Sequence, residues 1–283
     1  MSGPPSTFVI GIILSAALLH ALWNALIKGS ADRAITMGLI NLGHMVFGLV
    51  LVAIYLPPAA ASWPYIAGST FIHFFYYAFL LRAYRTGDLS QVYPIARGIA
   101  PLLVTLGAQI FAGEFLPPMA WAGILLVSFG ISTLFFGIRK GKTNPSAIIA
   151  AILTGCTIAA YSVVDGMGVR EAGSPLGYIG WLFVMEGLSS FWFLYYRRKF
   201  LSTITYKTIL LGIAGGGISA LAYGLAIYAK NLTSLGTVSA IRESSVIIAA
   251  LIGIIWFGER PWKSRIIAAI IVASGVIVLA VGG

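Results

Sequence analysis

Ten apolar segments of about 20 residues each follow one another along the chain, separated by short polar connections. They cover approximately Phe8–Ile27, Ile35–Tyr55, Tyr65–Arg82, Ser90–Phe111, Met119–Gly137, Ala147–Met167, Leu176–Tyr196, Thr208–Ala229, Thr237–Phe257 and Arg265–Val281. A helix of this length spans the hydrocarbon core of a bilayer, where every backbone polar group must be paired inside the protein. Continuous apolarity, without polar residues at alternate positions, argues against a membrane β-barrel. The segments therefore predict an all-α integral membrane protein with ten transmembrane helices.

The distribution of charged residues indicates how these segments are oriented in the membrane and does not indicate a surface that binds nucleic acid. Only 9% of the 283 residues are charged, against roughly 25% in soluble domains, although the formal net charge is +10. Fourteen of the 18 Lys and Arg residues lie in connections that follow an odd-numbered segment, whereas only Arg170 and Lys230 lie in the other connections. Because basic connections stay on the cytoplasmic side, we predict both termini outside the cytoplasm and no nucleic-acid partner.

The two halves of the chain repeat each other, which divides it into residues 1–142 and 143–283. A Gly-Glu pair precedes the last segment of each half, as Gly113-Glu114 and Gly258-Glu259. Further matches between the halves join His20 with Tyr161, Asn24 with Asp165, His73 with Ser219, Tyr77 with Tyr223, and Arg97 with Arg242. Five segments per half is an odd number, so the second half runs in the opposite orientation to the first. The sequence thus predicts two inverted five-helix repeats.

Four short strings make the chain resemble a known membrane family. They are HALWN at residues 20–24, YPIAR at residues 93–97, and the two Gly-Glu pairs. On these strings and its paired halves, the chain resembles the ten-helix EamA-type branch of the drug/metabolite transporter superfamily over essentially its whole length. The resemblance implies two inverted bundles around a central cavity, alternating access, and small metabolites as cargo. It does not fix the substrate.

Two arginines lie inside predicted spans, where an isolated charge costs at least ~2.5–3.5 kcal/mol. Arg97 and Arg242 occupy matching places in the two repeats. The planar guanidinium group of each can bind a carboxylate or a phosphoryl group. The alternative is that both arginines form structural ion pairs with neighbouring helices.

Three acidic residues also lie inside predicted spans, and each is predicted to carry a coupling proton or to pair with an arginine. Glu186 lies in the middle of its span, whereas Asp165 lies near an end, where capping the outer surface is the alternative. Arg242 and Glu243 are adjacent and project about 100° apart on a helix. We therefore expect one of these two to face the cavity and the other a partner helix, with their mutual neutralisation as the alternative.

Polar and aromatic side chains near these charges complete the predicted substrate site. Tyr93 lies four residues before Arg97, so both project from one helix face, and two prolines flank the arginine. The predicted substrate-binding residues are Arg97, Arg242, Tyr93, His20, Asn24, His73, Tyr77, Tyr161, Tyr223 and Trp181. For the uncharged members the alternative is hydrogen bonding between helices, which contributes about 0.6 kcal/mol per contact in a membrane.

Motifs for an enzyme, a metal site or a cofactor do not occur in the sequence. His-Glu-x-x-His, Gly-x-Ser-x-Gly and the phosphate-binding P-loop are missing, and a single Cys cannot supply a metal-binding pair. We therefore expect no enzyme activity, no metal and no cofactor. Without an ATP site, transport must be secondary.

Together these patterns predict a secondary transporter for a small polar metabolite that is anionic or zwitterionic. Amino acids, organic acids, and phosphorylated or phosphonate compounds are the leading cargo classes, and export or exchange is favoured over import. A proton-coupled drug exporter and a flippase for a phosphate-bearing lipid-linked intermediate stay open as alternatives. The expected partners are the substrate, the lipid bilayer and, as a candidate coupling ion, the proton. We expect a monomer or homodimer in a bacterial inner membrane.

Overall fold

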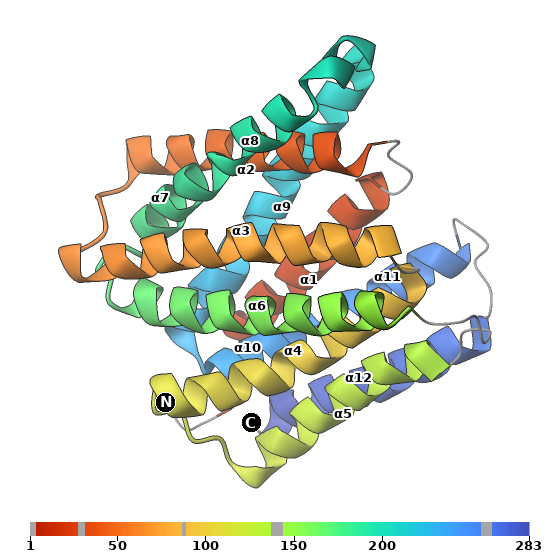
Figure 1. Ribbon diagram of the computed structural model, residues 1–283. Helices are drawn as coiled ribbons and strands as arrows, with labels where there is room; N and C mark the ends of the chain where they lie inside the picture. Colours follow the sequence, from red (N-terminus) through yellow and green to blue (C-terminus); the bar gives the residue numbers. More distant parts are fainter. Residues whose placement is uncertain (1–3, 28–31, 87–88, 137–143, 256–261, 283) are drawn as a thin grey trace.

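The computed structural model describes residues 4–27, 32–86, 89–136, 144–255 and 262–282. Within these ranges the chain consists of α-helices and two short 3-10 helices, Ala60–Ser62 and Arg198–Thr203, with no β-strand (Figure 1). The α-helices are α1 (Thr7–Ile27), α2 (Arg33–Ile54), α3 (Trp63–Thr86), α4 (Leu89–Phe111), α5 (Pro118–Phe136), α6 (Pro145–Arg170), α7 (Pro175–Gly187), α8 (Ser189–Tyr196), α9 (Tyr206–Leu232), α10 (Leu235–Arg242), α11 (Ser245–Ile255) and α12 (Trp262–Gly282). The predicted all-α class is confirmed.

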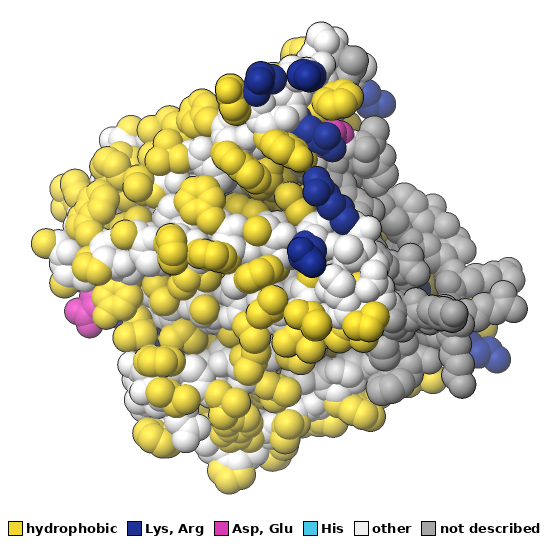
Figure 2. All heavy atoms as spheres, in the orientation of Figure 1, with side chains coloured by type: hydrophobic (Ala, Val, Ile, Leu, Met, Phe, Trp, Pro, Cys, Tyr) yellow, Lys and Arg dark blue, Asp and Glu magenta, His cyan; other side chains and the backbone are white. Residues whose placement is uncertain are grey.

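The helices and the molecular surface are those of an integral membrane protein. Seven segments in the described part of the chain are long and apolar enough to cross a membrane, with α10 and α11 taken as one. Hydrophobic side chains cover most of the face drawn in Figure 2, and Lys and Arg side chains gather along one edge. The remaining three predicted spans coincide with α3, α5 and the pair α7–α8. The number of ten spans therefore stays a prediction.

Polar side chains just before several helices cap their first turns. The side chains of Asp32, Asn144, Ser174 and Thr205 accept hydrogen bonds from backbone amides in the first turns of α2, α6, α7 and α9. These bonds satisfy amide groups that have no partner within the helix. Proline follows Asn144 and Ser174 at the first helical position, where its missing N–H is not needed.

The predicted span Leu176–Tyr196 is interrupted rather than continuous. At Leu188 the backbone amide bonds to the carbonyl of Met185 at 3.3 Å, which separates α7 from α8 with a tighter turn. The hydroxyl of Ser189 donates to the carbonyl of Glu186 at 2.7 Å. Gly187 packs so closely on α2 that a Cβ atom would overlap Met45. The prediction of one continuous helix was wrong here, because packing against α2 and a side-chain hydrogen bond interrupt the regular backbone hydrogen bonds of the helix.

The predicted span Thr237–Phe257 is interrupted in the same way. The amides of Glu243 and Ser244 bond to carbonyls three residues earlier, at 3.1 and 3.0 Å, so α10 ends and α11 begins one turn later. Both interruptions therefore fall beside charged residues inside the bundle, Glu186 in one helix and Arg242 with Glu243 in the other.

Small residues bring neighbouring helices close together. The most extensive contacts join α5 with α12, α3 with α6, α2 with α7 and α9, α4 with α6, and α1 with α9. On α2, a Cβ atom at Gly43 would lie 2.6 Å from a carbonyl oxygen of α9, and on α12 one at Gly275 would lie 2.7 Å from the carbonyl of Gly123. Such backbone-to-backbone packing replaces the hydrophobic effect, which cannot drive helix association in lipid.

A polar clasp lies at the end of the bundle where α6 and α9 end and α10 begins. The guanidinium of Arg170 lies 2.6 Å from one carboxylate oxygen of Glu114 and donates to the carbonyls of Lys230 and Thr233, both at 2.9 Å. The second oxygen of Glu114 accepts a hydrogen bond from the amide of Leu235, the first residue of α10, at 2.8 Å. The clasp thus ties the ends of α6 and α9 and the α4–α5 connection to the start of α10.

Lys230 lies inside α9 rather than in a connection. Its side chain is 1% exposed, its ammonium donates to the carbonyl of Ser162 at 3.0 Å, and it lies 5.7 Å from the ring centroid of Tyr223. The prediction that Lys230 lies in a connection was wrong, because α9 continues to Leu232, about one turn beyond the end of the predicted apolar span. A carbonyl and an aromatic face stabilise the charge that this places in the interior.

The neighbouring glycines Gly216 and Gly217 give a matched test of close packing. Gly216 faces the backbone of α2 at Ile40 and Gly43, whereas a Cβ atom at Gly217 has no neighbour within 4 Å. Gly216→Ala should destabilise the protein by about 1–3 kcal/mol through overpacking. Gly217→Ala should leave the melting temperature unchanged or raise it, since Ala favours helix. Tryptophan-fluorescence melting curves in detergent compare the two, and equal curves would contradict close packing of α2 on α9.

The clasp is tested by Arg170→Gln, which leaves the carboxylate of Glu114 without its cation. We expect a destabilisation of about 1–3 kcal/mol, the usual effect of removing one partner of a charged hydrogen bond. Arg82→Gln is the control, because Arg82 is exposed and its one side-chain hydrogen bond, to Ser146, is 3.4 Å long. An unchanged melting temperature for Arg170→Gln would mean that the clasp does not hold this end together.

Candidate functional site

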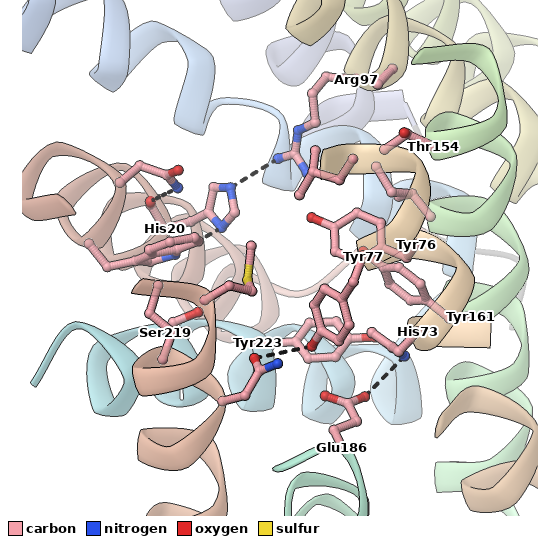
Figure 3. A pocket seen from close by; sticks show the side chains of 18 of the residues that line it. His20, His73, Tyr76, Tyr77, Arg97, Thr154, Tyr161, Glu186, Ser219 and Tyr223 are labelled. Atoms are coloured by element: carbon pink, nitrogen blue, oxygen red, sulfur yellow. Dashed lines mark hydrogen bonds and ion pairs between the residues drawn. The ribbon is translucent and has the colours of Figure 1, made fainter. Parts of the chain in front are cut away.

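A cavity of about 180 Å³ lies inside the bundle, among α1, α2, α3, α4, α6, α7, α9 and α10. This volume exceeds the ~10–15 Å³ that one water molecule needs, so the cavity has room for a small ligand. On the first four helices its lining runs from His20 to Asn24, from Met37 to His44, from His73 to Leu80 and from Val92 to Arg97. The cavity therefore lies toward the ends of α1 and α3 and the starts of α2 and α4, away from the clasp. Figure 3 shows Arg97 on one side, Glu186 on the opposite side, and tyrosines between them.

α4 carries Arg97 into the cavity between two prolines. Pro101 lacks an N–H, so the carbonyl of Arg97, four residues earlier, has no partner in the helix. The ring of Tyr93 lies 5.9 Å from the guanidinium, on the face that the four-residue spacing predicts. An Nη atom of Arg97 lies 3.4 Å from Nε2 of His20 on α1 (Figure 3).

The charge of Arg97 is compensated by Glu243. Nε of Arg97 lies 3.0 Å from a carboxylate oxygen of Glu243, and the two side chains are only 8% and 3% exposed. Arg97 lines the cavity, whereas Glu243 does not. The carboxylate thus reaches Arg97 from the protein side and leaves the other face of the guanidinium toward the cavity.

Arg242 also lines the cavity but has no carboxylate within ion-pair distance among the described residues. Its guanidinium lies 5.4 Å from the ring centroid of Tyr223, and its buried Nε has no hydrogen-bond partner. Arg242 ends α10, and the tight turn that follows directs Glu243 toward Arg97 instead. The adjacent pair therefore separates as predicted, with one member facing the cavity and the other a partner helix.

Two histidines face Glu186 on the opposite wall. An oxygen of Glu186 lies 3.1 Å from Nδ1 of His73 on α3, and the other lies 3.9 Å from Nδ1 of His44 on α2. Nδ1 of His73 is also 2.9 Å from the carbonyl of Ser69. Neither ring nitrogen of His44 has a hydrogen-bond partner. Glu186 therefore pairs with imidazoles, not with an arginine, among the residues described.

Aromatic rings form the wall between the arginines and Glu186. His73 stacks on Tyr161 with ring centroids 4.1 Å apart, and Tyr76 meets Tyr161 edge to face at 5.7 Å. The hydroxyl of Tyr77 donates to the side-chain oxygen of Asn41 at 3.2 Å. Flat apolar faces with hydroxyl tips suit a small organic molecule better than a bare ion.

Asp165 lies behind this wall rather than in the cavity. It is fully buried, and its carboxylate accepts hydrogen bonds from the hydroxyls of Tyr178 and Tyr223. Tyr223 lines the cavity, so one tyrosine separates Asp165 from the cavity. The alternative that Asp165 caps the outer surface is wrong, since no part of the side chain is exposed.

The structure brings together every predicted substrate-binding residue except Trp181. The lining includes His20, Asn24, His73, Tyr77, Tyr93, Arg97, Tyr161, Tyr223 and Arg242, together with Glu186. The ring of Trp181 instead contacts Trp63, with centroids 5.1 Å apart. Within the described residues no group of three or more His, Cys, Asp or Glu side chains is placed to hold a metal ion.

Sequence reasoning missed several lining residues, chiefly on α2. Asn41 and His44 lie three residues apart on one face of α2, and both border the cavity. That spacing was the available signal, because polar residues on one face of an apolar span point to the protein interior. Thr154 and Ser219 also line the cavity. For Ser219 the available signal was its match to His73 in the repeat, whereas Thr154 is too small to stand out in an apolar segment.

Comparison with known proteins gives a family match for the second half of the chain and a fold match for the whole chain. A family described as the EamA-like transporter family matches residues 145–281. A search of curated proteins found no match. A solved structure, titled only "Crystal structure of protein", is similar over 96% of this chain and 96% of its own, with a TM-score of 0.72 and 18% identity, which establishes a shared fold. The second half of the chain matches the family directly, and the fold likeness covers the whole chain. Residues 145–281 therefore carry an EamA-like transporter domain, and members of that family are membrane transporters of the drug/metabolite type rather than enzymes.

Proposed function

We propose that the protein is a secondary transporter that exports or exchanges a small anionic or zwitterionic metabolite by alternating access. Candidate cargoes are amino acids, organic acids, and phosphorylated or phosphonate compounds. The observation that carries the proposal is Arg242, a cavity-lining cation without a carboxylate partner among the described residues.

The energetics of a buried arginine support this assignment. Arg97 has Glu243 as its counter-ion, so its ion pair accounts for its burial. Among the described residues, Arg242 has no carboxylate partner; its guanidinium lies over the ring of Tyr223 and borders the cavity. An uncompensated charge inside a membrane protein is costly, and a ligand carboxylate or oxyanion that binds it removes that cost. An arginine fork is also well matched in geometry to such groups.

Alternating access between two inverted repeats is supported by how the helices pair. α5 packs on α12 and α4 on α10, which are helices at corresponding places in residues 1–142 and 143–283. The pairing of α1 with α9 is mirrored by that of α6 with α3. Such exchange-symmetric contacts are expected when one half is the inverted copy of the other.

The cavity and the clasp lie toward opposite ends of the bundle. This favours a state in which the site faces the basic connections while the clasp of Arg170 and Glu114 closes the other end. Under the positive-inside rule the basic connections are cytoplasmic, so we propose that this is the inward-facing state. The interruptions beside Glu186 and Arg242 support a central site, because discontinuous helices form the substrate sites of many transporters.

Glu186 is the proposed carrier of a coupling proton. A buried carboxylate beside an imidazole is most stable as a neutral pair, which holds one proton in total. His73 provides that imidazole at 3.1 Å, and His44 on α2 lies at 3.9 Å. Because the pair borders the cavity, losing or gaining its proton changes the charge that a ligand meets.

Replacing Arg242 tests the anion site. Arg242→Gln should weaken ligand binding by about tenfold to a hundredfold, because a hydrogen bond to a charged group contributes about 1.5–3 kcal/mol. A thermal-shift screen of purified protein against a small-metabolite library identifies the ligand, and flux into proteoliposomes then compares wild type, Arg97→Gln and Arg242→Gln. Arg198→Gln, an exposed change at the basic end, is the control.

Three results would overturn the anion site. Normal binding and flux in both arginine variants would reduce the arginines to structural roles. Stabilisation by lipophilic cations alone would indicate a drug exporter. Movement of a phosphate-bearing lipid in liposomes, without any soluble ligand, would indicate a flippase.

Replacing Glu186 tests the proton site. Glu186→Gln cannot ionise, so accumulation driven by a pH gradient should be lost while exchange of substrate for substrate continues. Asp165→Asn is the matched comparison, because Asp165 is equally buried but lies outside the cavity lining. Proton-driven uptake in proteoliposomes is the measurement. If Asp165→Asn loses pH-driven uptake while Glu186→Gln keeps it, the coupling proton is carried by Asp165 and the assignment to Glu186 is wrong.

A further inference from the structure

The net charge around the cavity restricts which ligands it can hold. In a site shielded from water, each unit of charge that stays uncompensated is costly, whether it belongs to the protein or to the ligand. The charged side chains that line the cavity or pair with its lining fall into three groups, on α4 with the α10–α11 turn, on α7 with α3, and at the end of α10. Behind Tyr223, Asp165 and Lys230 add one acidic and one basic group of opposite formal charge, which together leave the net charge unchanged.

The first group is the pair of Arg97 and Glu243, with a net charge of zero. Their 3.0 Å separation and near-complete burial make the pair a fixed unit. His20 adds no charge beside it, because an imidazolium 3.4 Å from the guanidinium would be repelled. A ligand that touches Arg97 can therefore accept its hydrogen bonds but meets a cation whose charge is already balanced.

The second group is Glu186 with His73, which is neutral with one shared proton and carries one negative charge without it. The third group is Arg242 alone, which carries one positive charge and has no acidic partner among the described residues. The site as a whole therefore has a net charge of plus one when the Glu186 pair holds its proton, and zero when it does not.

We propose that Glu243 is a specificity-determining residue, which limits the ligand to a net charge of minus one or zero and excludes dianions. This inference rests on the proposed function of Arg242 as an anion site. A monoanion balances Arg242 while the Glu186 pair holds its proton. A zwitterion places its acid at Arg242 and its ammonium at the deprotonated Glu186.

A dianion has no such arrangement in this cavity. A phosphate monoester carries nearly two negative charges at neutral pH. One of them would stay unbalanced, because Glu243 already holds the charge of Arg97. The cargo classes proposed above thereby narrow to carboxylates, sulfonates and zwitterions, without phosphate monoesters.

Glu243→Gln is the sharpest test, because it keeps the side-chain shape and an acceptor oxygen for Arg97 while removing the charge. The site then carries one more positive charge and should accept dianions. The probes are two pairs of similar shape, succinamate with succinate and ethyl sulfate with ethyl phosphate, at pH 7.5. Within each pair the first member carries one negative charge and the second nearly two. Binding is measured by isothermal calorimetry and thermal shift on purified protein in detergent.

We expect wild type to prefer the monoanion of each pair and Glu243→Gln to shift the ratio toward the dianion. The shift in the binding ratio should be on the order of tenfold to a hundredfold. Removing one unit charge a few ångströms from the ligand changes the binding free energy of a dianion more than that of a monoanion, at an effective dielectric constant near 20. Glu243→Asp keeps the charge and should keep the monoanion preference. The double variant Arg97→Gln/Glu243→Gln restores the original net charge and should restore the preference for monoanions.

The outcomes separate this inference from the function on which it rests. Equal binding of both members of each pair to wild type, or a Glu243→Gln ratio that does not shift, overturns the charge filter while leaving an anion site. A shift that persists in the double variant also overturns it, because the effect would then come from structure rather than charge. If no probe binds to wild type, to Glu243→Gln or to Arg242→Gln, the proposal of an anion site at Arg242 is itself wrong.

Discussion

The salt bridge between Arg97 and Glu243 is the interaction on which the architecture of the site depends. It joins α4 of the first half to the turn between α10 and α11 in the second, so the two halves meet through a buried charge pair. In a low-dielectric interior neither charge is stable without the other. Satisfying this pair requires a tight turn after Arg242, and that turn leaves Arg242 facing the cavity.

The same requirement for compensation explains the other polar groups inside the bundle. Glu186 has two imidazoles, Asp165 has two tyrosine hydroxyls, and Lys230 has a carbonyl and an aromatic face. Each buried charge is thus held by a different kind of partner, and these partners come from other helices or from distant turns. Arg242 differs because its main open neighbour is the cavity. This difference, rather than burial itself, distinguishes the proposed ligand site from the structural ion pairs.

Much of this could be predicted from the sequence, because apolar length and helical spacing are local properties. Tyr93 with Arg97 and His20 with Asn24 face the same cavity as their spacing requires. The helix interruptions at Leu188 and Glu243 could not be predicted, since they arise from contacts with α2 and α4 that lie far away in the chain. Lys230 was misplaced for a related reason, because a charged residue near the end of an apolar stretch is normally found in water. Its partner, the carbonyl of Ser162, is invisible in the sequence.

The eight-residue helix α10 connects the clasp with the cavity. Its first amide is held by Glu114 in the clasp, and its last residue is Arg242 in the cavity. A helix of this length is about 12 Å long and too short to bend appreciably, so it acts as a rigid lever. Displacement of either end must move the other. If Arg242 binds a ligand as proposed, any displacement of its guanidinium would therefore be transmitted along α10 to the hydrogen bond between Leu235 and Glu114 at the far side of the bundle.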